Sequence, residues 1–288
     1  MWKPETVLFY INYYALRAAR AVSRSAAGDG TFDARLCRYC MPARKNVFVR
    51  PERVVQVVGI PRSGTTLVGA LLGAHRRTLS LIEPFLSYVK NGSFAWTDAS
   101  GAGRVCFRPP LRFINRVTSG VGGKDLLAFK ETWRNERQDY FPNSDFIRRN
   151  AEGGVRTIAV LRDPRAIWRS FVRRPGTEYE GAPGDAFVSN WNSYCEWMVE
   201  QKLFCVRYED LMLQPDAETG RLFSYLGLPS LEKPIRLACV YGHGDERGQS
   251  GEAIAPRFSD VDEGLAPQVS RTILDSCGGW MRRLGYLR

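Results

Sequence analysis

The stretch that decides the fold is Val54-Val55-Gln56-Val57-Val58-Gly59-Ile60-Pro61-Arg62-Ser63-Gly64-Thr65-Thr66. It predicts a buried strand, a glycine-framed turn and the start of a helix, which is the architecture of a phosphate-binding loop. The spacing Gly59-x4-Gly64-x-Thr66 matches the nucleoside-triphosphate version of that loop. Thr65, however, replaces the lysine that reaches the β- and γ-phosphates there, and Arg62 lies inside the loop. The loop therefore predicts a phosphorylated ligand whose binding does not need a lysine at position 65.

The composition suits one large α/β domain with a basic surface. Of the 288 residues, 44% are hydrophobic, which is enough for a sizeable core. The net charge of +11 is compatible with a nucleic acid, an anionic membrane or an anionic small ligand as partner. Seven cysteines, an odd number without a signal peptide, indicate reduced thiols and a cytoplasmic location. Cys37 and Cys40 form a lone C-x-x-C, so we expect no zinc or redox site there.

The first 47 residues form a basic extension. Residues 7–21 are apolar but are interrupted by Asn12, Arg17 and Arg20. The sequence contains no run of about 20 apolar residues, so it predicts no transmembrane helix. We expect an amphipathic helix that packs on the domain, with peripheral contact to a membrane as the alternative.

From residue 47 onwards, short apolar runs alternate with helical stretches. This alternation predicts an α/β, three-layer P-loop-type fold with a central parallel sheet flanked by helices. Strands are expected at 54–58, 78–82, 126–129, 157–161 and 203–206, and helices at 66–74, from 163 onwards, and at 186–200. The aromatic residues of the last helix fall at helical spacing and predict core packing. Residues 92–123, dotted with glycine, break the pattern and are either a substrate-facing excursion or a plain disordered loop.

A polar or charged residue follows each predicted strand. These residues are Arg62 and Ser63, Glu83, Lys130, Arg162, and Arg207 with Tyr208. In doubly wound sheets, ligands bind at the carboxyl edge of the strands. Five strand ends that deliver functional groups to one edge therefore predict a site there.

Geometry favours Glu83 over His75 as a general base. The helix after the loop would carry His75 roughly 13 Å away from the loop. The next strand returns about 16 Å, which places Glu83 back beside the loop. We therefore expect His75 to be a surface or helix-terminal residue. His243 lies in a glycine-rich segment and is a weaker candidate.

A second anion site is predicted where the fourth strand ends. Arg162 leaves this strand, an Asp163-Pro164 pair starts a helix, and Ser170 lies about two turns further on. Arg174 shares the helix face of Ser170. Together these side chains predict a second phosphate site, with an exposed basic helix in ordinary salt bridges as the alternative.

These motifs resemble the sulfotransferases that use 3'-phosphoadenosine 5'-phosphosulfate (PAPS). The resemblance rests on Gly-x-Pro-Arg-Ser-Gly-Thr-Thr at 59–66, Arg-Asp-Pro-Arg at 162–165 and the serine eight residues after Arg162. Val-Arg-Tyr-Glu-Asp-Leu at 206–211, Leu-Gly-Leu-Pro at 226–229 and Leu-Gly-Tyr at 284–286 support it. The resemblance extends from residue 54 to the C-terminus. It implies a sulfotransferase domain at 48–288 that follows the extension at 1–47.

The resemblance implies a role for each matching residue. The 5'-phosphosulfate would be held by Arg62, Ser63, Gly64, Thr65 and Thr66. The 3'-phosphate would be bound by Arg162, Ser170 and Arg174, with Tyr208 near the adenosine-phosphate end. Arg247 and Ser250 resemble the loop that closes over the 3'-phosphate, although they depart from its Arg-Lys-Gly pattern.

The catalytic residues resemble the tyrosyl-protein and carbohydrate branch more than the cytosolic small-phenol branch. Glu83 is similar to the glutamate base of that branch and Lys130 to its catalytic lysine. The resemblance implies in-line transfer of a sulfuryl group from PAPS to an acceptor hydroxyl, with Glu83 as base. Arg62 and Lys130 would stabilise the charge that builds on the sulfuryl and bridging oxygens, and no metal would be required.

Two alternatives come from other functional classes. A P-loop kinase or NTPase that acts on a small molecule is opposed by Thr65 and by Arg162, which stands where an aspartate would hold magnesium. A non-catalytic nucleic-acid-binding protein is suggested by the charge, but no RNA- or DNA-reading motif is present, so we expect no nucleic-acid partner.

The sequence leaves the acceptor open. We expect a small-molecule or glycan acceptor, and carbohydrate, lipid, peptide-tyrosine and metabolite hydroxyls all remain possible. Acceptor specificity is expected in residues 84–123, in 133–137 and in the N-terminal extension.

Overall fold

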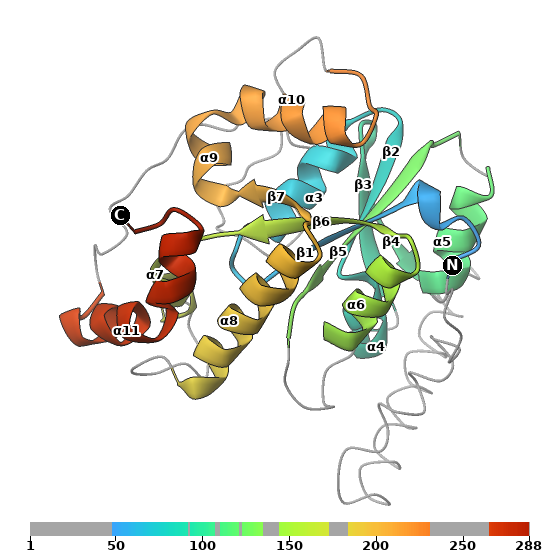
Figure 1. Ribbon diagram of the computed structural model, residues 1–288. Coiled ribbons are helices and arrows are strands. Elements are labelled where there is room, and N and C mark those ends of the chain that lie inside the picture. Colours follow the sequence, from blue (N-terminus) through green and yellow to red (C-terminus); the bar gives the residue numbers. More distant parts are fainter. Residues whose placement is uncertain are drawn as a thin grey trace, which may run out of the picture.

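The computed structural model describes residues 48–91, 93–106, 110–120, 123–134, 144–172, 184–230 and 265–287 (Figure 1). The first 47 residues, Cys37, Cys40 and His243 lie outside these ranges. The predictions for them, including the domain boundary at residue 48, stay predictions.

The described residues form one seven-stranded sheet in the order β4-β3-β2-β5-β1-β6-β7. The strands are β1 (Val54–Gly59), β2 (Thr78–Ile82), β3 (Ser93–Asp98), β4 (Gly101–Cys106), β5 (Leu126–Thr132), β6 (Arg156–Leu161) and β7 (Phe204–Arg207). The strands β2, β5, β1, β6 and β7 pair in parallel, whereas β3 and β4 pair antiparallel. The predicted central parallel sheet is therefore confirmed, with an antiparallel hairpin added at one edge.

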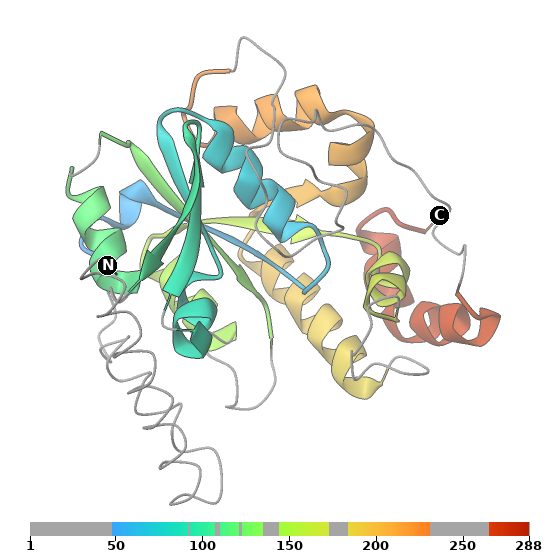
Figure 2. The same cartoon turned by 180° about the vertical axis from the view of Figure 1, so that it is seen from behind.

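Helices cover both faces of the sheet, as Figures 1 and 2 show. They are α3 (Thr65–Ala74), α4 (Pro84–Asn91), α5 (Pro110–Thr118), α6 (Ser144–Glu152), α7 (Pro164–Val172), α8 (Asp185–Glu200), α9 (Tyr208–Leu213), α10 (Pro215–Tyr225) and α11 (Pro267–Arg283). A short 3-10 helix at Pro51–Arg53 precedes β1. The apolar residues of α3, α9 and α10 pack on one face of the sheet, and those of α4, α5, α6, α7, α8 and α11 pack on the other. This is the predicted three-layer arrangement.

The strand β5 is longer than predicted, so Lys130 lies within the strand and not after its end. It runs alongside β1, with Gly59 opposite Thr132, and the amide of Trp133 donates to the carbonyl of Gly59 at 2.9 Å. The prediction ended at Phe129 because two charged residues follow. The strand continues because both charges find partners inside the protein.

Residues 92–123 are not a plain disordered loop where the structure describes them, whereas their predicted role towards a substrate stays a prediction. They contribute the hairpin of β3 and β4 and the helix α5. An Asx turn reverses the chain, because the side chain of Asp98 accepts from the amide of Ser100 at 2.8 Å. Gly103 is required opposite Trp96, since an added Cβ would lie 2.8 Å from the indole. Gly103, one of the glycines that suggested irregular structure, thus allows close packing in a sheet.

The aromatic residues of α8 are core residues, as predicted. Trp191 and Tyr194 are fully buried. The Tyr194 hydroxyl donates to the carbonyls of Val58 at 3.0 Å and Val160 at 3.1 Å, near the carboxyl ends of β1 and β6. Burial raises the pKa of this phenol, so it stays a neutral donor. Tyr194 therefore fixes the spacing of these two strands just before the residues of the candidate site.

Among the described residues, no helix is both long and apolar enough to cross a membrane. Cys195, Cys205 and Cys277 are free thiols in this part of the chain. The cytoplasmic location stays a prediction.

Candidate active site

The loop after β1 is a tight turn that ends at a helix N-terminus. The amide of Ser63 donates to the carbonyl of Ile60 at 3.0 Å. Arg62 and Gly64 both have left-handed backbones, with φ of 75° and 99°. At Gly64 a Cβ would also lie only 2.4 Å from the ring of Tyr208. Glycine is therefore required at position 64 for two separate reasons, its φ angle and its contact with Tyr208.

Ser63 and Thr65 lie beneath the loop. Both side chains are buried, and a Cβ on Gly59 would lie 2.4 Å from Ser63 Oγ and 2.8 Å from Thr65 Cγ2. These two side chains therefore shape the loop from below, whereas Thr66 is partly exposed. The predicted contacts of all three residues with a phosphosulfate stay predictions.

The N-terminus of α3 suits an anion. Gly64 is its N-cap and supplies no side chain, and the first turn carries no acidic residue. The first backbone N–H groups of a helix have no partner within the helix, and the helix dipole adds positive potential there. A phosphate group is the kind of ligand that this end of α3 would bind.

The second predicted anion site adjoins the loop. Arg162 follows β6, and its Nη1 donates to the carbonyl of Arg62 at 2.9 Å. The guanidinium of Arg162 lies 4.2 Å from the centre of the Tyr208 ring, which also faces Gly64. The Arg62 Nε donates to Ser170 Oγ at 2.8 Å. Arg62, Arg162, Ser170 and Tyr208 thus form one group, which we call the basic rim.

Three other predicted binding residues, Arg174, Arg247 and Ser250, lie outside the described residues. Their roles stay predictions.

Glu83 and Lys130 form a buried ion pair at the same edge of the sheet. The Lys130 Nζ lies 2.6 Å from Glu83 Oε1, and both side chains are at most 10% exposed. The backbone amide of Glu83 also donates to the carbonyl of Lys130 at 2.8 Å. The structure therefore brings together the predicted base and the predicted catalytic lysine.

Glu83 occupies an unusual backbone conformation. Its φ is +43°, in the left-handed region that few residues other than glycine adopt. Pro84 starts α4 directly after it, and the amide of Ser87 donates to the Glu83 carbonyl at 2.8 Å. Such strain persists only where the surroundings enforce it, and it often marks functional positions.

His75 was predicted to be a surface or helix-terminal residue, and it is the C-cap of α3 but is buried. It is 1% exposed, and its ring lies edge-on to Phe223 with centroids 5.1 Å apart. Its Nδ1 accepts from the amide of Arg77 at 3.2 Å. Burial lowers its pKa, so it is a neutral structural histidine at the sheet edge opposite Glu83.

Trp133 was predicted to contribute to acceptor specificity, but it is fully buried and stacks on Trp197 with ring centroids 4.6 Å apart. It is therefore a core residue. Phe85 and Phe94, within the predicted specificity range 84–123, are also fully buried.

Glu131 was missed by the sequence reasoning. It is fully buried on the opposite face of β5 from Lys130, and its Oε1 accepts from the amide of Phe85 at 3.0 Å. Its Oε2 has no hydrogen-bond partner among the described residues. Burial, together with the nearby charge of Glu83, raises its pKa well above the usual range. A charged residue beside Lys130 in an apolar strand was the signal that could have revealed it.

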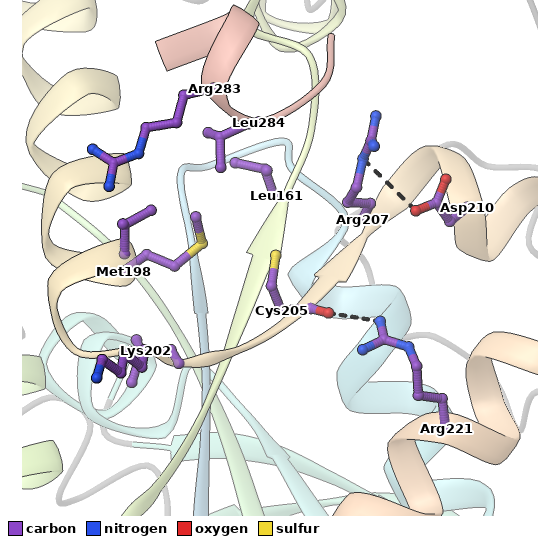
Figure 3. A pocket seen from close by; sticks show the side chains of 11 residues that line it. Leu161, Met198, Lys202, Cys205, Arg207, Asp210, Arg221, Arg283 and Leu284 are labelled. Atoms are coloured by element: carbon purple, nitrogen blue, oxygen red, sulfur yellow. Dashed lines mark hydrogen bonds and ion pairs between the residues drawn. The ribbon is translucent and has the colours of Figure 1, made fainter.

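A groove of about 390 Å³ lies beside β7 (Figure 3). It has an apolar floor that includes Leu161 and Met198, with Arg207 and Asp210 at one side. Arg207, one of the residues that follow the predicted strands, lines this groove, but none of the residues assigned to catalysis or to nucleotide binding does. The groove and the basic rim are therefore separate features of the described structure.

No protein-family model matches the chain. A putative protein-tyrosine sulfotransferase of Caenorhabditis briggsae is 27% identical over 198 residues, which cover 62% of this chain and 66% of that protein. Protein-tyrosine sulfotransferase A of Caenorhabditis elegans is 26% identical over 270 residues, covering 82% of this chain and 68% of that protein. The chain is similar to protein-tyrosine sulfotransferases. It spans about two thirds of the length of these relatives.

Among solved structures, the sulfotransferase domain of the Synechococcus PCC 7002 olefin synthase has the same fold. It superposes with a TM-score of 0.50 at 16% identity and covers 81% of this chain and 96% of that domain. The predicted resemblance and the predicted P-loop-type fold are thus confirmed. The comparisons support a sulfuryl-transferring enzyme and do not favour the kinase alternative.

The raised pKa of Glu131 predicts how stability depends on pH. The folded state keeps a proton that the unfolded chain releases above about pH 4.5, so this group makes the wild type less stable as the pH rises towards its folded pKa. Glutamine does not titrate and keeps an oxygen for the Phe85 amide. We therefore expect the stability of Glu131→Gln relative to wild type to increase with pH, as measured by urea unfolding between about pH 4.5 and pH 8. Glu152→Gln on the exposed end of α6 is the matched control. A difference that stays constant with pH would contradict the assignment.

Proposed function

We propose that the protein transfers a sulfuryl group from PAPS to an acceptor hydroxyl, and that a tyrosine phenol in a polypeptide is the first acceptor to test. The names of the two Caenorhabditis relatives support this acceptor class. The chemistry is supported by the basic rim and the Glu83–Lys130 pair, which lie at the carboxyl edge of the same sheet.

One observation carries the proposal. Arg62, from the phosphate-binding loop, donates to Ser170, from the second anion site, and accepts through its carbonyl from Arg162. The two anion sites are therefore adjacent, as a nucleotide with phosphates at both its 5' and 3' positions requires. A nucleoside triphosphate carries its phosphates in a single chain and gives no reason for the second site.

In the proposed mechanism, the first turn of α3 and Arg62 hold the 5'-phosphosulfate, and Arg162 and Ser170 hold the 3'-phosphate. The acceptor oxygen forms a bond to sulfur as the bond from sulfur to the bridging oxygen breaks. Glu83 takes the hydroxyl proton, and 3',5'-bisphosphoadenosine (PAP) leaves with the bridging oxygen.

Lys130 and Arg62 supply the positive charge that this reaction needs. Before the acceptor arrives, the Lys130 ammonium lies 2.6 Å from the Glu83 carboxylate and orients it. Its ammonium and the Arg62 guanidinium would stabilise negative charge on the sulfuryl and bridging oxygens. Fixed cations are most effective where water is excluded, and Lys130 is only 3% exposed.

Nucleotide binding provides the direct test. We expect PAP to raise the melting temperature by several degrees at about 100 times its Kd, where ligand linkage contributes about 2.7 kcal/mol. Mg-ATP should produce a much smaller shift, because the chain lacks the triphosphate lysine at position 65. Differential scanning fluorimetry with both nucleotides measures the two shifts. A shift with Mg-ATP and none with PAP would overturn the proposed function.

Replacing Glu83 by Gln should lower kcat by roughly 10²- to 10⁴-fold, the usual contribution of a general base. The variant keeps the shape of the side chain, so PAP affinity should stay close to that of the wild type. Turnover is measured with labelled PAPS and a tyrosine-containing peptide, and Glu152→Gln on α6 is the control. An unchanged kcat in a folded Glu83→Gln variant would exclude Glu83 as the base.

Turnover should persist in EDTA, because Arg62 and Lys130 would provide the charge that magnesium provides in phosphoryl transfer. We expect equal rates with EDTA and with added Mg²⁺ in the same labelled-PAPS assay. Loss of turnover in EDTA that magnesium restores would show that the scheme lacks a metal.

A further inference from the structure

Two residues without a role in the proposed mechanism are in contact in the structure, one from the motif at 206–211 and one from the motif at 284–286. Glu209 follows Tyr208 at the start of α9, and Tyr286 follows α11 near the C-terminus. Glu209 Oε2 accepts from the Tyr286 hydroxyl at 3.0 Å. Glu209 Oε1 accepts from the backbone amide of Asp163 at 2.9 Å. One carboxylate therefore links the C-terminal segment to the residue that directly follows Arg162.

The end of α11 explains how Tyr286 reaches Glu209. Gly285 has a φ of +76°, and the amide of Tyr286 turns back to the carbonyl of Met281 at 2.8 Å. This is the left-handed helix ending for which glycine is preferred. The Arg207 guanidinium then lies 4.5 Å from the centre of the Tyr286 ring. The turn and the ring contact together hold the hydroxyl in place.

Arg207 contacts Asp210 as well as Tyr286. Its Nε lies 3.7 Å from Asp210 Oδ2, the ion pair drawn in Figure 3. Leu284, next to the turn, lines the same groove as Arg207. The support of Tyr286 is therefore built from the last residue of β7, the first turn of α9 and the end of α11.

The start of α9 contacts both Arg162 and the residue that follows it. The Tyr208 ring contacts the Arg162 guanidinium, and the Glu209 carboxylate fixes the amide of Asp163. Asp163 is also fixed as the N-cap of α7, because its Oδ1 accepts from the Arg165 amide at 2.8 Å. With Glu209 in place, the turn between β6 and α7 has little freedom, and Arg162 leaves that turn.

We propose that Glu209 and Tyr286 are positioning residues for Arg162, and that through it they set the affinity for the 3'-phosphate of the donor nucleotide. This inference rests on the proposed function. Neither residue needs to touch the nucleotide. Tyr286 orients Glu209, and Glu209 fixes the backbone from which Arg162 reaches the phosphate. Because an arginine recognises phosphate through directed N–H groups, a small loss of orientation lowers affinity.

The test compares two nucleotides that differ in the 3'-phosphate. Binding of PAP and of adenosine 5'-phosphosulfate is measured by titration calorimetry or competition for wild type, Tyr286→Phe, Glu209→Ala and Glu209→Gln. We expect Tyr286→Phe and Glu209→Ala each to lower the affinity for PAP about tenfold, which is the usual effect of losing one hydrogen bond to a charged group. The affinity for adenosine 5'-phosphosulfate should fall by less than about twofold, since this nucleotide lacks the 3'-phosphate that Arg162 would bind.

Three controls separate positioning from general damage. Glu209→Gln keeps an oxygen for the Asp163 amide, so it should recover most of the PAP affinity that Glu209→Ala loses. Tyr225→Phe removes a hydroxyl from an exposed tyrosine on α10 and should change neither affinity. In Tyr286→Phe, the KM for PAPS should rise while kcat at saturating PAPS stays within about twofold, because the Glu83–Lys130 pair is untouched.

A double-mutant cycle with Arg162→Ala tests whether Glu209 affects the affinity for PAP through Arg162. If Glu209 acts through Arg162, the variant Arg162→Ala with Glu209→Ala binds PAP no more weakly than Arg162→Ala alone. Additive losses, or equal weakening of both nucleotides in a folded variant, would overturn the inference while leaving the proposed function intact. A wild-type protein that binds no PAP would instead remove the proposed function itself.

Discussion

The arrangement of the candidate site depends on the close contact between Gly64 and Tyr208. The turn after β1 can enter α3 only with a left-handed residue at position 64, and a Cβ there would overlap the Tyr208 ring. The same ring supports the guanidinium of Arg162, which in turn binds the carbonyl of Arg62. The ends of β1, β6 and β7 are thereby held together by one aromatic side chain. The Tyr208 ring therefore packs against both anion sites, and it adds to the pairing of β1 with β6 and the hydrogen bonds of Arg62 that already hold these sites at a fixed distance.

Local signals predicted much of this arrangement. A buried strand followed by a glycine-framed turn specifies a phosphate-binding loop from about a dozen consecutive residues, and β1 and α3 appear where that pattern placed them. Glu83 was placed from the length of one helix and the strand that returns beside it, and it does lie beside Lys130. Such arguments succeed when helix and strand geometry alone carries a residue to its position.

The errors arose where a residue's environment is set by distant parts of the chain. Lys130 and Glu131 looked like the end of a strand, because their partners Glu83 and Phe85 are 46 or 47 positions away. His75 was placed correctly at the end of a helix, but its burial was not predicted because nothing in the neighbouring sequence indicates a contact with Phe223. The bond between Glu209 and Tyr286 spans 77 positions. Even when both motifs are noticed in the sequence, their contact becomes visible only in the fold.

The Glu83–Lys130 pair is better explained by chemistry than by stability. Removing two charges from water costs several kcal/mol per ion, and well-packed apolar residues often replace such pairs without loss of stability. Here Glu83 also has a left-handed backbone, and a second carboxyl, that of Glu131, is buried nearby. Since Glu131 keeps its proton, it fixes α4 without adding a second negative charge beside Glu83. Lys130 is therefore the counter-charge of the proposed base in a nearly dry environment, where the base would accept the proton of an acceptor hydroxyl.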